Sequence, residues 1–362
     1  MSVLIICEKP SVAKTVALAL GAAEQKDGYL SGDGLLVSWC IGHLISMADA
    51  GSYDERYKKW RYEELPILPQ TWKYAPTPGK EKQLAILKEL LHRSDVSEVV
   101  NGCDAGREGE LIFRFVYEQA GCTKPFSRLW ISSMEDSAIR EGFAGRRAGT
   151  EYDALYQSAL CRARADWLVG INATRLFSVL YHKTLNVGRV LSPTLNLLVE
   201  RDGKITMFHK EKYHIVHIGC GGVDAESERI SDAAAADTLR TTCEASQAVC
   251  VSLKKEKKTA LPPKLFDLTC LQREANRVYG FTAKQTLDYA QSLYEKRFLT
   301  YPRTDSNYLT EDMAQTATDL VAALLPVLPF VRGAELVPEI GRVINSAKVS
   351  DHHAIIPTAA FA

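Results

Sequence analysis

The chain has 362 residues, of which 46% are hydrophobic and 24% are charged. This composition is typical of two or three folded globular domains and excludes a largely disordered protein. The 44 Lys and Arg residues balance the 44 Asp and Glu residues. Net charge therefore gives no reason to expect a polyanionic partner, and any nucleic-acid site must be local.

Targeting signals and cysteine pairs are both absent from the sequence. No apolar run reaches the ~18 residues of a membrane span, and the run in MSVLIICEKP soon meets charged residues. We therefore predict no membrane segment, no signal peptide and a cytoplasmic location. The nine cysteines form no CxxC pair, which argues against a zinc ribbon and a disulfide framework. We expect reduced, mostly buried thiols.

Two strand-turn-helix units occur in the first part of the chain. Residues 3–7 are predicted as a strand and residues 11–20 as a helix with Ser11 as its N-cap. Residues 97–103 are a second predicted strand, followed by the acidic turn DAGREGE and an amphipathic helix. Such units favour a parallel, doubly wound sheet, in which ligands bind beyond the carboxyl ends of the strands. Glu8 and Asp104 would meet there.

The rest of the chain contains several segments with distinct sequence patterns. The expected features are an elaborated connection at 39–72, a helical, arginine-rich stretch at 151–199, strands at 213–220 and 248–253, an exposed joint at 254–263, and helices within 265–298. Gly280 separates the last two helices, and Pro302 is expected to end the second one.

A carboxylate cluster lies in the acidic turn. Asp104, Glu108 and Glu110 fall within seven residues, beside Arg107. Hard oxygen ligands of this kind suit Mg²⁺, but acidic residues also favour helix N-termini as exposed caps. Spacing alone leaves both interpretations open, and a meeting with Glu8 would favour the metal site.

Glu8 is followed by Lys9 and Pro10 where a strand gives way to a helix. A carboxylate beside an ammonium group suits proton transfer and stabilisation of a phosphate. Glu8 by itself is weak evidence for such a site.

Several motifs together resemble a known family. ICEKPSVAK and CDAGREGE resemble the Toprim domain, which type IA topoisomerases share with some primases and nucleases. The segment LYEKRFLTYPRTDSNYLT at 293–310 is similar to the active-site segment of type IA topoisomerases, which primases lack. WCIGHL, YKKWRYEELPILP, RARADWLVGINATR, VGRVLSPTLNLLVERD and DHHAIIPT extend the resemblance, which favours the topoisomerase III branch.

The resemblance implies an α/β and α multidomain fold. We predict a Toprim domain with a Rossmann-like parallel sheet at 1–150, a helical DNA-binding domain at 151–212, a strand-rich arch segment at 213–264 and a helical domain with the catalytic tyrosine at 265–362. The family continues beyond DHHAIIPT, so the arch would be incomplete and its strands would have exposed edges.

The same resemblance assigns the catalytic residues. Tyr301 would attack a phosphate of single-stranded DNA and form a 5′-phosphotyrosine, leaving a free 3′ hydroxyl. Arg303 would favour the phenolate and hold the phosphate, although most arginines are ordinary surface residues. Lys9 would stabilise the phosphate charge, and Glu8 would carry a proton to or from the 3′ oxygen. His352 is matched to a histidine near the nucleophile, with a purely structural role as the alternative.

The resemblance also implies a Mg²⁺ site. Its ligands would be Glu8, Asp104 and Glu108, and the ion would serve religation and order in the site. Type IA enzymes commonly carry an acidic residue where this chain has Gly106, so one potential ligand is missing. Three carboxylates with water and DNA phosphates would still suffice.

Contacts to DNA are implied for a further group of residues. This group comprises Arg162, Arg164, Arg189, Ser192 and Asp305, with Asp305 also a candidate support for Arg303 or Tyr301. Phosphate contacts of this kind add salt-dependent affinity rather than sequence preference. Trp60, Trp130 and Trp167 are not assigned to DNA, because tryptophans in regular elements are more often core anchors.

The predicted function is that of a topoisomerase III-like enzyme, which cleaves one strand, passes another and religates without ATP, to relax negative supercoils or to decatenate. Its partner would be single-stranded DNA, bound by a monomer, while the sequence leaves a helicase partner open. The main alternative is a truncated fragment that binds single-stranded DNA without completing strand passage. A Toprim nuclease or primase is a weaker alternative, because of the TYPRTDS segment.

Overall fold

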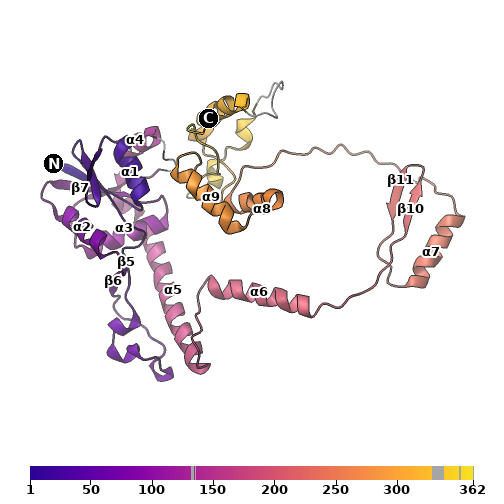
Figure 1. The fold of residues 1–362 in the computed structure, drawn as a ribbon, viewed down its shortest axis with the longest axis horizontal. Helices are drawn as coiled ribbons and strands as arrows, with labels where there is room; N and C mark the ends of the chain where they lie inside the picture. The colour runs from indigo at the N-terminus through magenta and orange to yellow at the C-terminus, as the bar shows by residue number, and fades with distance from the viewer. Residues whose placement is uncertain (132–133, 135, 328–337, 350–351, 362) are drawn as a thin grey trace. The chain divides into compact units, whose positions relative to one another are not determined.

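The computed structural model describes residues 1–131, 134, 136–327, 338–349 and 352–361. It forms two compact units, which are described separately. The first unit combines residues 1–188 with 263–362, and the second comprises residues 189–262. Figure 1 shows the elements of both. The four predicted domains remain a prediction, but the joint expected at 254–263 coincides with the end of the second unit.

The elements are as follows. In residues 1–188 the strands are β1 (Ser2–Cys7), β2 (Glu24–Lys26), β3 (Tyr29–Gly32), β4 (Leu35–Trp39), β5 (Ile45–Met47), β6 (Tyr74–Pro76), β7 (Val96–Gly102), β8 (Phe126–Arg128) and β9 (Arg147–Ala148). The helices of this part are α1 (Pro10–Ala19), α2 (Glu81–His92), α3 (Arg107–Gln119), α4 (Asp136–Ala144) and α5 (Asp153–Leu180). Residues 189–262 form α6 (Leu191–Thr206), β10 (His217–Cys220), β11 (Val223–Glu226) and α7 (Ala233–Ala245). The C-terminal part contains α8 (Leu268–Tyr279), α9 (Ala283–Glu295) and α10 (Ala314–Leu324).

The main sheet has the strand order β2-β3-β4-β1-β7-β8-β9. Its centre is parallel, since β1 pairs in parallel with β4 and β7, and β7 pairs in parallel with β8. The predicted parallel sheet is thus confirmed at its centre. The antiparallel edge strands were not predicted, and they arise where tight turns at Gly28 and Gly34, both at positive φ, join β2, β3 and β4.

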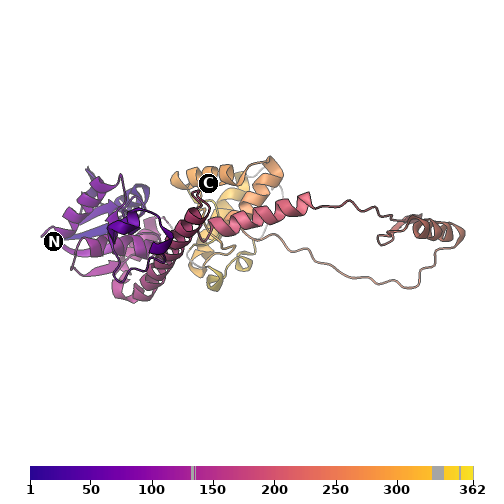
Figure 2. The same ribbon diagram turned by 90° about the horizontal axis from the view of Figure 1, so that it is seen from below.

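Helices cover both faces of this sheet (Figures 1 and 2). On β1, Leu4 and Ile6 pack in one core with residues of α2, α3 and α5, while Ile5 and Cys7 pack in another with residues of α1 and α4. A strand that is buried on both faces reads as an uninterrupted apolar run, which explains VLIIC in the sequence.

Helix α1 begins one residue earlier than expected. Its N-cap is Lys9 and its first residue is Pro10, so the prediction of Ser11 as the N-cap is wrong. Proline suits the first helical position because its fixed φ matches the helix and its missing N–H has no partner to lose. Glu8 and Lys9 therefore lie between strand and helix, at the carboxyl edge of the sheet.

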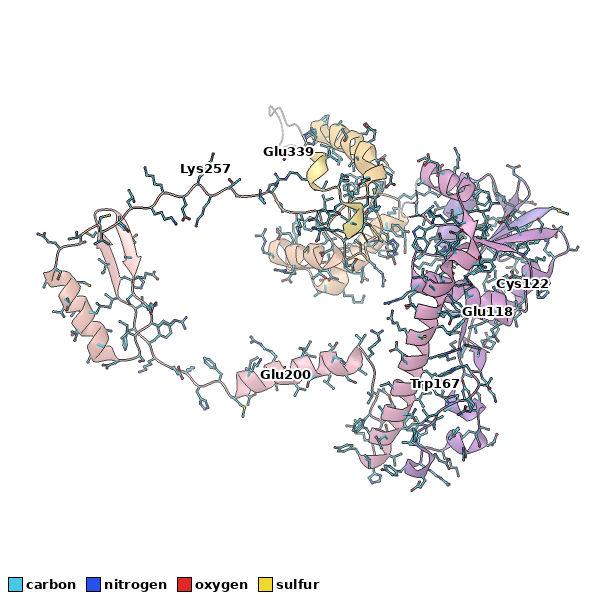
Figure 3. The ribbon with its side chains drawn as sticks, turned by 180° about the vertical axis from the view of Figure 1, so that it is seen from behind. Glu118, Cys122, Trp167, Glu200, Lys257 and Glu339 are labelled. Carbon is cyan, nitrogen blue, oxygen red and sulfur yellow. The ribbon has the colours of Figure 1, made fainter. Side chains whose placement is uncertain are left out.

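The long helix α5 packs along the connection between β5 and β6. The Asn172 side chain accepts a hydrogen bond from the Ile67 N–H at 2.6 Å and donates to the Ile67 carbonyl at 3.0 Å. Trp167, labelled on this helix in Figure 3, donates from Nε1 to the Ala48 carbonyl at 3.0 Å. The predicted elaborated connection is therefore held by side chains of α5.

The tyrosine-bearing part begins with a helical hairpin. Gly280 lies between α8 and α9 with φ at 70°, a left-handed conformation that glycine adopts without strain. Helix α9 ends at Glu295, well before Pro302, so the prediction that Pro302 ends it is wrong. The chain turns at Arg297 (φ 64°) and continues as extended backbone, paired with the segment after residue 352.

The second unit differs most from expectation. Strands β10 and β11 form a hairpin whose residues are all exposed, in line with the predicted exposed edges. Residues 248–253 have no regular secondary structure, so the second predicted strand is wrong. Helix α7 was not predicted, although Asp232 caps it by accepting bonds from the N–H groups of Ala234 and Ala235. The cap at Asp232 favours helix α7. Residues 248–253 have a strand-like sequence but pair with no neighbouring strand in the described part of the chain, so they form no strand.

All nine cysteines are free. The buried ones are Cys7, Cys40, Cys103 and Cys122, so the expectation of mostly buried thiols is wrong. None of the helices in the described ranges is long and apolar enough to cross a membrane.

Candidate active site

The carboxyl edge of the sheet brings Glu8 and Asp104 together. Glu8 follows β1, Asp104 follows the neighbouring strand β7, and both contact the ammonium group of Lys9. The Lys9 Nζ lies 3.3 Å from Glu8 Oε1 and 3.2 Å from Asp104 Oδ2. The expectation that these two distant carboxylates meet is confirmed.

Burial and charge control protonation in this group. Burial raises the pKa of Glu8, and the negative charge of Asp104 raises it further. Burial alone would lower the pKa of Lys9, but Asp104 and Glu8 outweigh it, so its pKa is raised. Lys9 is therefore firmly charged, while Glu8 holds a proton more readily than an ordinary glutamate.

Tyr301 lies over this group. The Lys9 Nζ is 5.6 Å from the centroid of the Tyr301 ring. The centroid of the His352 ring is 4.3 Å from that of Tyr301, and the centroid of Tyr294 is 5.3 Å away on an edge contact. The structure thus joins Glu8, Lys9, Tyr301 and His352, which lie far apart in the sequence.

The Tyr301 hydroxyl is not activated in this state. Burial raises its pKa, and among the charges Lys9 lowers it most, with Arg303 acting more weakly. From the sequence this effect is expected of Arg303, which is exposed. Lys9 is the stronger cation, and its Nζ lies 5.6 Å from the centroid of the Tyr301 ring.

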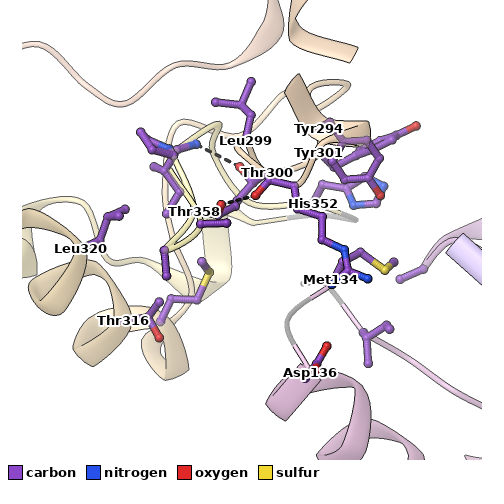
Figure 4. Close-up of a pocket in the computed structure, with 18 of the residues that line it drawn as sticks. Met134, Asp136, Tyr294, Leu299, Thr300, Tyr301, Thr316, Leu320, His352 and Thr358 are labelled. Carbon is purple, nitrogen blue, oxygen red and sulfur yellow. Dashed lines mark hydrogen bonds between the residues drawn. The ribbon is translucent and has the colours of Figure 1, made fainter. Parts of the chain in front are cut away.

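A cavity of about 620 Å³ opens beside Tyr301. Figure 4 shows Tyr301, Tyr294 and His352 on one side and Met134 and Asp136, from the N-terminal part, on another. Asp104 also lines it. The cavity therefore gives a substrate simultaneous access to the tyrosine and to the carboxyl edge of the sheet.

Hydrogen bonds fix the two segments that carry Tyr301 and His352. The Thr300 N–H donates to the Ile356 carbonyl at 3.0 Å, and the Ile356 N–H donates to Thr300 Oγ1 at 2.9 Å. Thr304 Oγ1 donates to the His352 carbonyl at 2.8 Å. Asp351 of the DHHAIIPT motif lies outside the described residues.

A buried arginine braces the loop that carries Asp104. The Arg128 guanidinium donates to the carbonyls of Cys103 and Asp104, each at 2.7 Å, and its Nε lies 2.7 Å from Glu110 Oε1. Arg128 is 1% and Glu110 0% exposed. Glu110 is therefore a structural anchor rather than a member of the carboxylate cluster at the edge. Sequence reasoning missed Arg128, because arginine in a short strand normally indicates a surface position.

Gly109 allows this loop to lie against the start of α3. A Cβ at Gly109 would come within 2.1 Å of the Asp104 carbonyl oxygen. The second glycine of DAGREGE is thus required by close backbone approach.

Glu108 faces away from the other two expected metal ligands. Its carboxylate lies 2.9 Å from Arg162 Nη1 and 3.8 Å from His43 Nε2. The contact with His43, together with the charge of Arg162, lowers the pKa of Glu108. In the described ranges, no group of three or more Asp, Glu, His or Cys side chains is arranged to hold a metal. The structure therefore joins Glu8 and Asp104 but does not bring Glu108 to them.

The expected DNA-binding residues are scattered. Arg162 pairs with Glu108, and the Arg164 guanidinium lies 5.4 Å from the ring centroid of Trp72. Arg189 and Ser192 belong to the second unit, and Asp305 is exposed four residues after Tyr301. Arg162 is linked, through Glu108, to the start of α3 near the carboxyl edge of the sheet.

Comparison with known proteins gives two matches to family models. Residues 3–134 match the Toprim domain, and residues 150–362 match the DNA topoisomerase family. The two matched segments cover the carboxylate edge and Tyr301, respectively.

Related proteins and a solved structure support the same family. The chain is 42% identical to DNA topoisomerase 3 of Shouchella clausii and 41% identical to DNA topoisomerase 3 of Bacillus subtilis. Each match covers 98% of the chain but 50% of the relative, so the chain spans about half the length of these relatives. Full-length topoisomerase I of Thermotoga maritima matches with a TM-score of 0.66 and 27% identity, over 99% of this chain and 55% of that one. The chain therefore belongs to the type IA DNA topoisomerase family, with a Toprim domain in its N-terminal part.

Proposed function

We propose that Tyr301 cleaves single-stranded DNA by forming a covalent phosphotyrosine, with Glu8, Lys9, Arg303 and His352 as the other catalytic residues. The observation that carries the proposal is the position of the Tyr301 ring over Lys9, against His352, at the cavity that also reaches Asp104. A tyrosine with a surface or purely structural role would not require a lysine, a histidine and an open cavity beside its ring.

The reaction exchanges one phosphate ester for another. The Tyr301 oxygen attacks the phosphorus, the bond from phosphorus to the 3′ oxygen breaks, and the 5′ side of the break stays on the tyrosine. Tyr301 loses a proton and the 3′ oxygen gains one, so no proton is gained or lost overall. Religation is the reverse, with the 3′ hydroxyl as nucleophile, and therefore needs no ATP.

Glu8 suits the proton transfer to the 3′ oxygen. Its raised pKa favours the protonated form, which donates to the leaving oxygen during cleavage. The resulting carboxylate then accepts the proton back during religation. Asp104, which contacts the same Lys9 ammonium group, adds to this effect by raising the pKa of Glu8.

Two cations suit the negative phosphate. Lys9 stays charged between its two carboxylates and offers an ammonium group beneath the tyrosine. Arg303, exposed two residues after Tyr301, is free to turn toward a bound strand and to make paired hydrogen bonds to phosphate oxygens. In this proposal Arg303 holds the substrate, while Lys9 stabilises the charge that develops in the transition state.

Mg²⁺ fits the pair of carboxylates. A single ammonium group already touches both Glu8 and Asp104, so they lie close enough to share one cation. Mg²⁺ is commonly held by one or two carboxylates plus water and substrate phosphates, so Glu108 is not required as a third ligand. When bound, the ion would add positive charge beside the phosphate.

The wider activity is proposed by family likeness. Relatives named DNA topoisomerase 3 suggest strand passage, with relaxation or decatenation as the outcome and single-stranded DNA as the partner. In this reading Arg162, Arg164, Arg189, Ser192 and Asp305 contact the strand around the cleavage site. The alternative is a protein that binds single-stranded DNA without completing strand passage.

The test is to trap the covalent intermediate. A single-stranded oligonucleotide is labelled on the segment 3′ of the cleaved bond, which keeps the 5′-phosphoryl group and stays on the tyrosine. It is incubated with the protein, the mixture is denatured, and the adduct is mapped by mass spectrometry. We expect label on Tyr301, none in Tyr301→Phe, and normal labelling in Tyr308→Phe, which changes another tyrosine of the same segment. Absence of an adduct in wild-type protein, while a full-length relative forms one, would sink the proposal.

A second assay separates the two functional readings. The same preparation is given negatively supercoiled DNA without ATP. Relaxation indicates complete strand passage, whereas salt-dependent DNA binding without relaxation indicates the alternative.

A further inference from the structure

The far end of α5 carries an aromatic and basic surface that the cleavage site does not use. Trp60 lies in the connection between β5 and β6, and its side chain is 43% exposed. An indole that only anchored the connection against α5 would be covered, as in the packed cluster of Trp167 with Tyr53 and Trp72. Trp60 is instead presented at the surface.

The Trp60 ring is held in place from α5. The Arg175 guanidinium lies 5.4 Å from the ring centroid and is itself 5% exposed. Its Nη1 donates to the Tyr57 carbonyl at 2.7 Å, which ties the connection to the helix. A buried cation over an aromatic ring stabilises the ring's position and leaves it preorganised for a further contact.

A pocket of about 360 Å³ opens beside Trp60. It is lined by Trp60 together with Ser178, Val179, His182, Lys183 and Thr184, at the end of α5 and just beyond it. Among these described lining residues there is one fixed cation and one histidine, but no carboxylate. His182 has φ at 50°, which is unusual for a residue other than glycine after a helix.

The charges around the pocket divide into paired and available ones. Lys58 pairs with Glu55, and Arg56 pairs with Asp54 and Glu64. In contrast, the described part of the chain offers no ion-pair partner to Lys59, Arg61 or Lys183, all of which are exposed. Two exposed cations thus flank Trp60 in the chain and a third, Lys183, lines its pocket, although the chain as a whole has no net charge.

We propose that this surface, defined by Trp60, Lys59, Arg61 and Lys183, binds single-stranded DNA that flanks the cleaved segment. A base stacks on the Trp60 ring, and the lysines and Arg61 contact neighbouring phosphates. Stacking platforms combined with cations bind single strands without sequence preference, because every base has a flat face. The inference rests on the proposed function for its substrate class.

Helix α5 sets the reach of this site. Arg162, paired with Glu108 near the carboxyl edge of the sheet, and Ser178, in the pocket, lie on the same helix. Sixteen residues at ~1.5 Å each separate them by about 24 Å. At ~3.4 Å per nucleotide of a stacked strand, this span is roughly seven nucleotides. Only a strand that extends well beyond the cleaved bond reaches Trp60.

The test compares a short oligonucleotide that covers only the cleavage site with two longer ones, extended by about ten nucleotides on the 5′ or on the 3′ side. Binding is measured by fluorescence anisotropy over a salt series, with wild-type protein and with Trp60→Ala, Trp60→Phe and Lys183→Gln. We expect Trp60→Ala to weaken binding of one extended strand about tenfold, and Trp60→Phe much less. Lys183→Gln should lower the salt slope by about one.

Lys82→Gln is the matched control, because it removes an exposed lysine on α2 that does not line the Trp60 pocket. It should leave both affinity and salt slope near wild type. Folding of every variant is checked by thermal unfolding, and adduct formation at Tyr301 with the short oligonucleotide should be unchanged.

The outcomes separate this inference from the proposed function. Equal affinity of wild-type and Trp60→Ala protein for both extended strands overturns the inference, even if the Tyr301 adduct forms normally. Loss of affinity in Trp60→Ala supports it, even if no adduct forms and the proposed function fails. Equal weakening of the short oligonucleotide would assign Trp60 to general folding and also overturn the inference.

Discussion

The two halves of the candidate site are built differently. Glu8 and Asp104 project from the ends of adjacent parallel strands, and Arg128 holds the second of these loops from within the core. Tyr301 lies on extended backbone whose support is hydrogen bonding to the segment after residue 352. The carboxylate half is thus part of a large buried sheet, whereas the tyrosine half rests on a few backbone and threonine hydrogen bonds and on a smaller core that includes Ala354 and Ile356.

This difference suits the proposed chemistry. The carboxylates and Lys9 must keep their relative positions in both cleavage and religation, and a buried sheet provides that rigidity. The tyrosine must carry a DNA strand while it is covalently attached. A support made of few hydrogen bonds opens at a lower free-energy cost than a packed core.

The largest effect is expected for Arg128→Met. It leaves the buried Glu110 carboxylate without its 2.7 Å ion pair and with Arg114 and Asn101 as its remaining contacts, so we expect about 3 kcal/mol loss in the free energy of unfolding. Urea denaturation measures it. Arg146→Met, which breaks a half-exposed pair with Glu98, should cost less than about 1 kcal/mol. A loss at Arg128 no larger than at Arg146 would contradict the view that the carboxylate half is the rigid one.

Lys9→Gln should mainly affect chemistry. It removes the cation beneath Tyr301, and we expect cleavage to slow by about 10²–10³-fold, as when one transition-state donor is lost. Single-turnover adduct formation is the measurement. Lys14→Gln, on the exposed face of the same helix, serves as the control and should be near wild type. A normal rate in Lys9→Gln would remove Lys9 from the mechanism.

Thr304→Val tests the tyrosine half. It deletes the hydrogen bond to the His352 carbonyl and the acceptor of the Ser306 N–H, at an expected cost of about 1–3 kcal/mol in stability. Because the lost hydrogen bond also positions the His352 segment beside Tyr301, adduct formation should slow as well. Thr318→Val removes a similar bond on exposed α10 and should change neither quantity much. Equal effects of the two changes would show that Thr304 has no special role.

The smallest effect is expected in the pH dependence of cleavage. The pKa of Glu8 is raised, so its protonated fraction persists to higher pH than in an ordinary glutamate and falls as pH rises through the raised value. Cleavage should therefore decline over that range in wild type. Glu8→Gln, which holds no titrating proton, should be slower but should lack this decline. An identical pH profile in both proteins would exclude Glu8 as the proton donor.

The sequence by itself determined the parts and the local elements. Short apolar runs located β1 and β7, and helical patterns located α3 and the hairpin of α8 and α9, where Gly280 supplies the left-handed turn. The motifs around Glu8, Asp104 and Tyr301 named the family and the candidate residues. These features depend on neighbours within one turn or one strand.

Only the tertiary structure decided how the parts meet. Lys9 rather than Arg303 is the main cation at Tyr301, Glu108 turns to Arg162 and His43, and Glu110 is buried against Arg128. Trp60, left unassigned by sequence, is an exposed ring over a buried arginine. Each of these outcomes depends on contacts between residues far apart in the chain, where burial and neighbouring charge, rather than local pattern, set the role of a side chain.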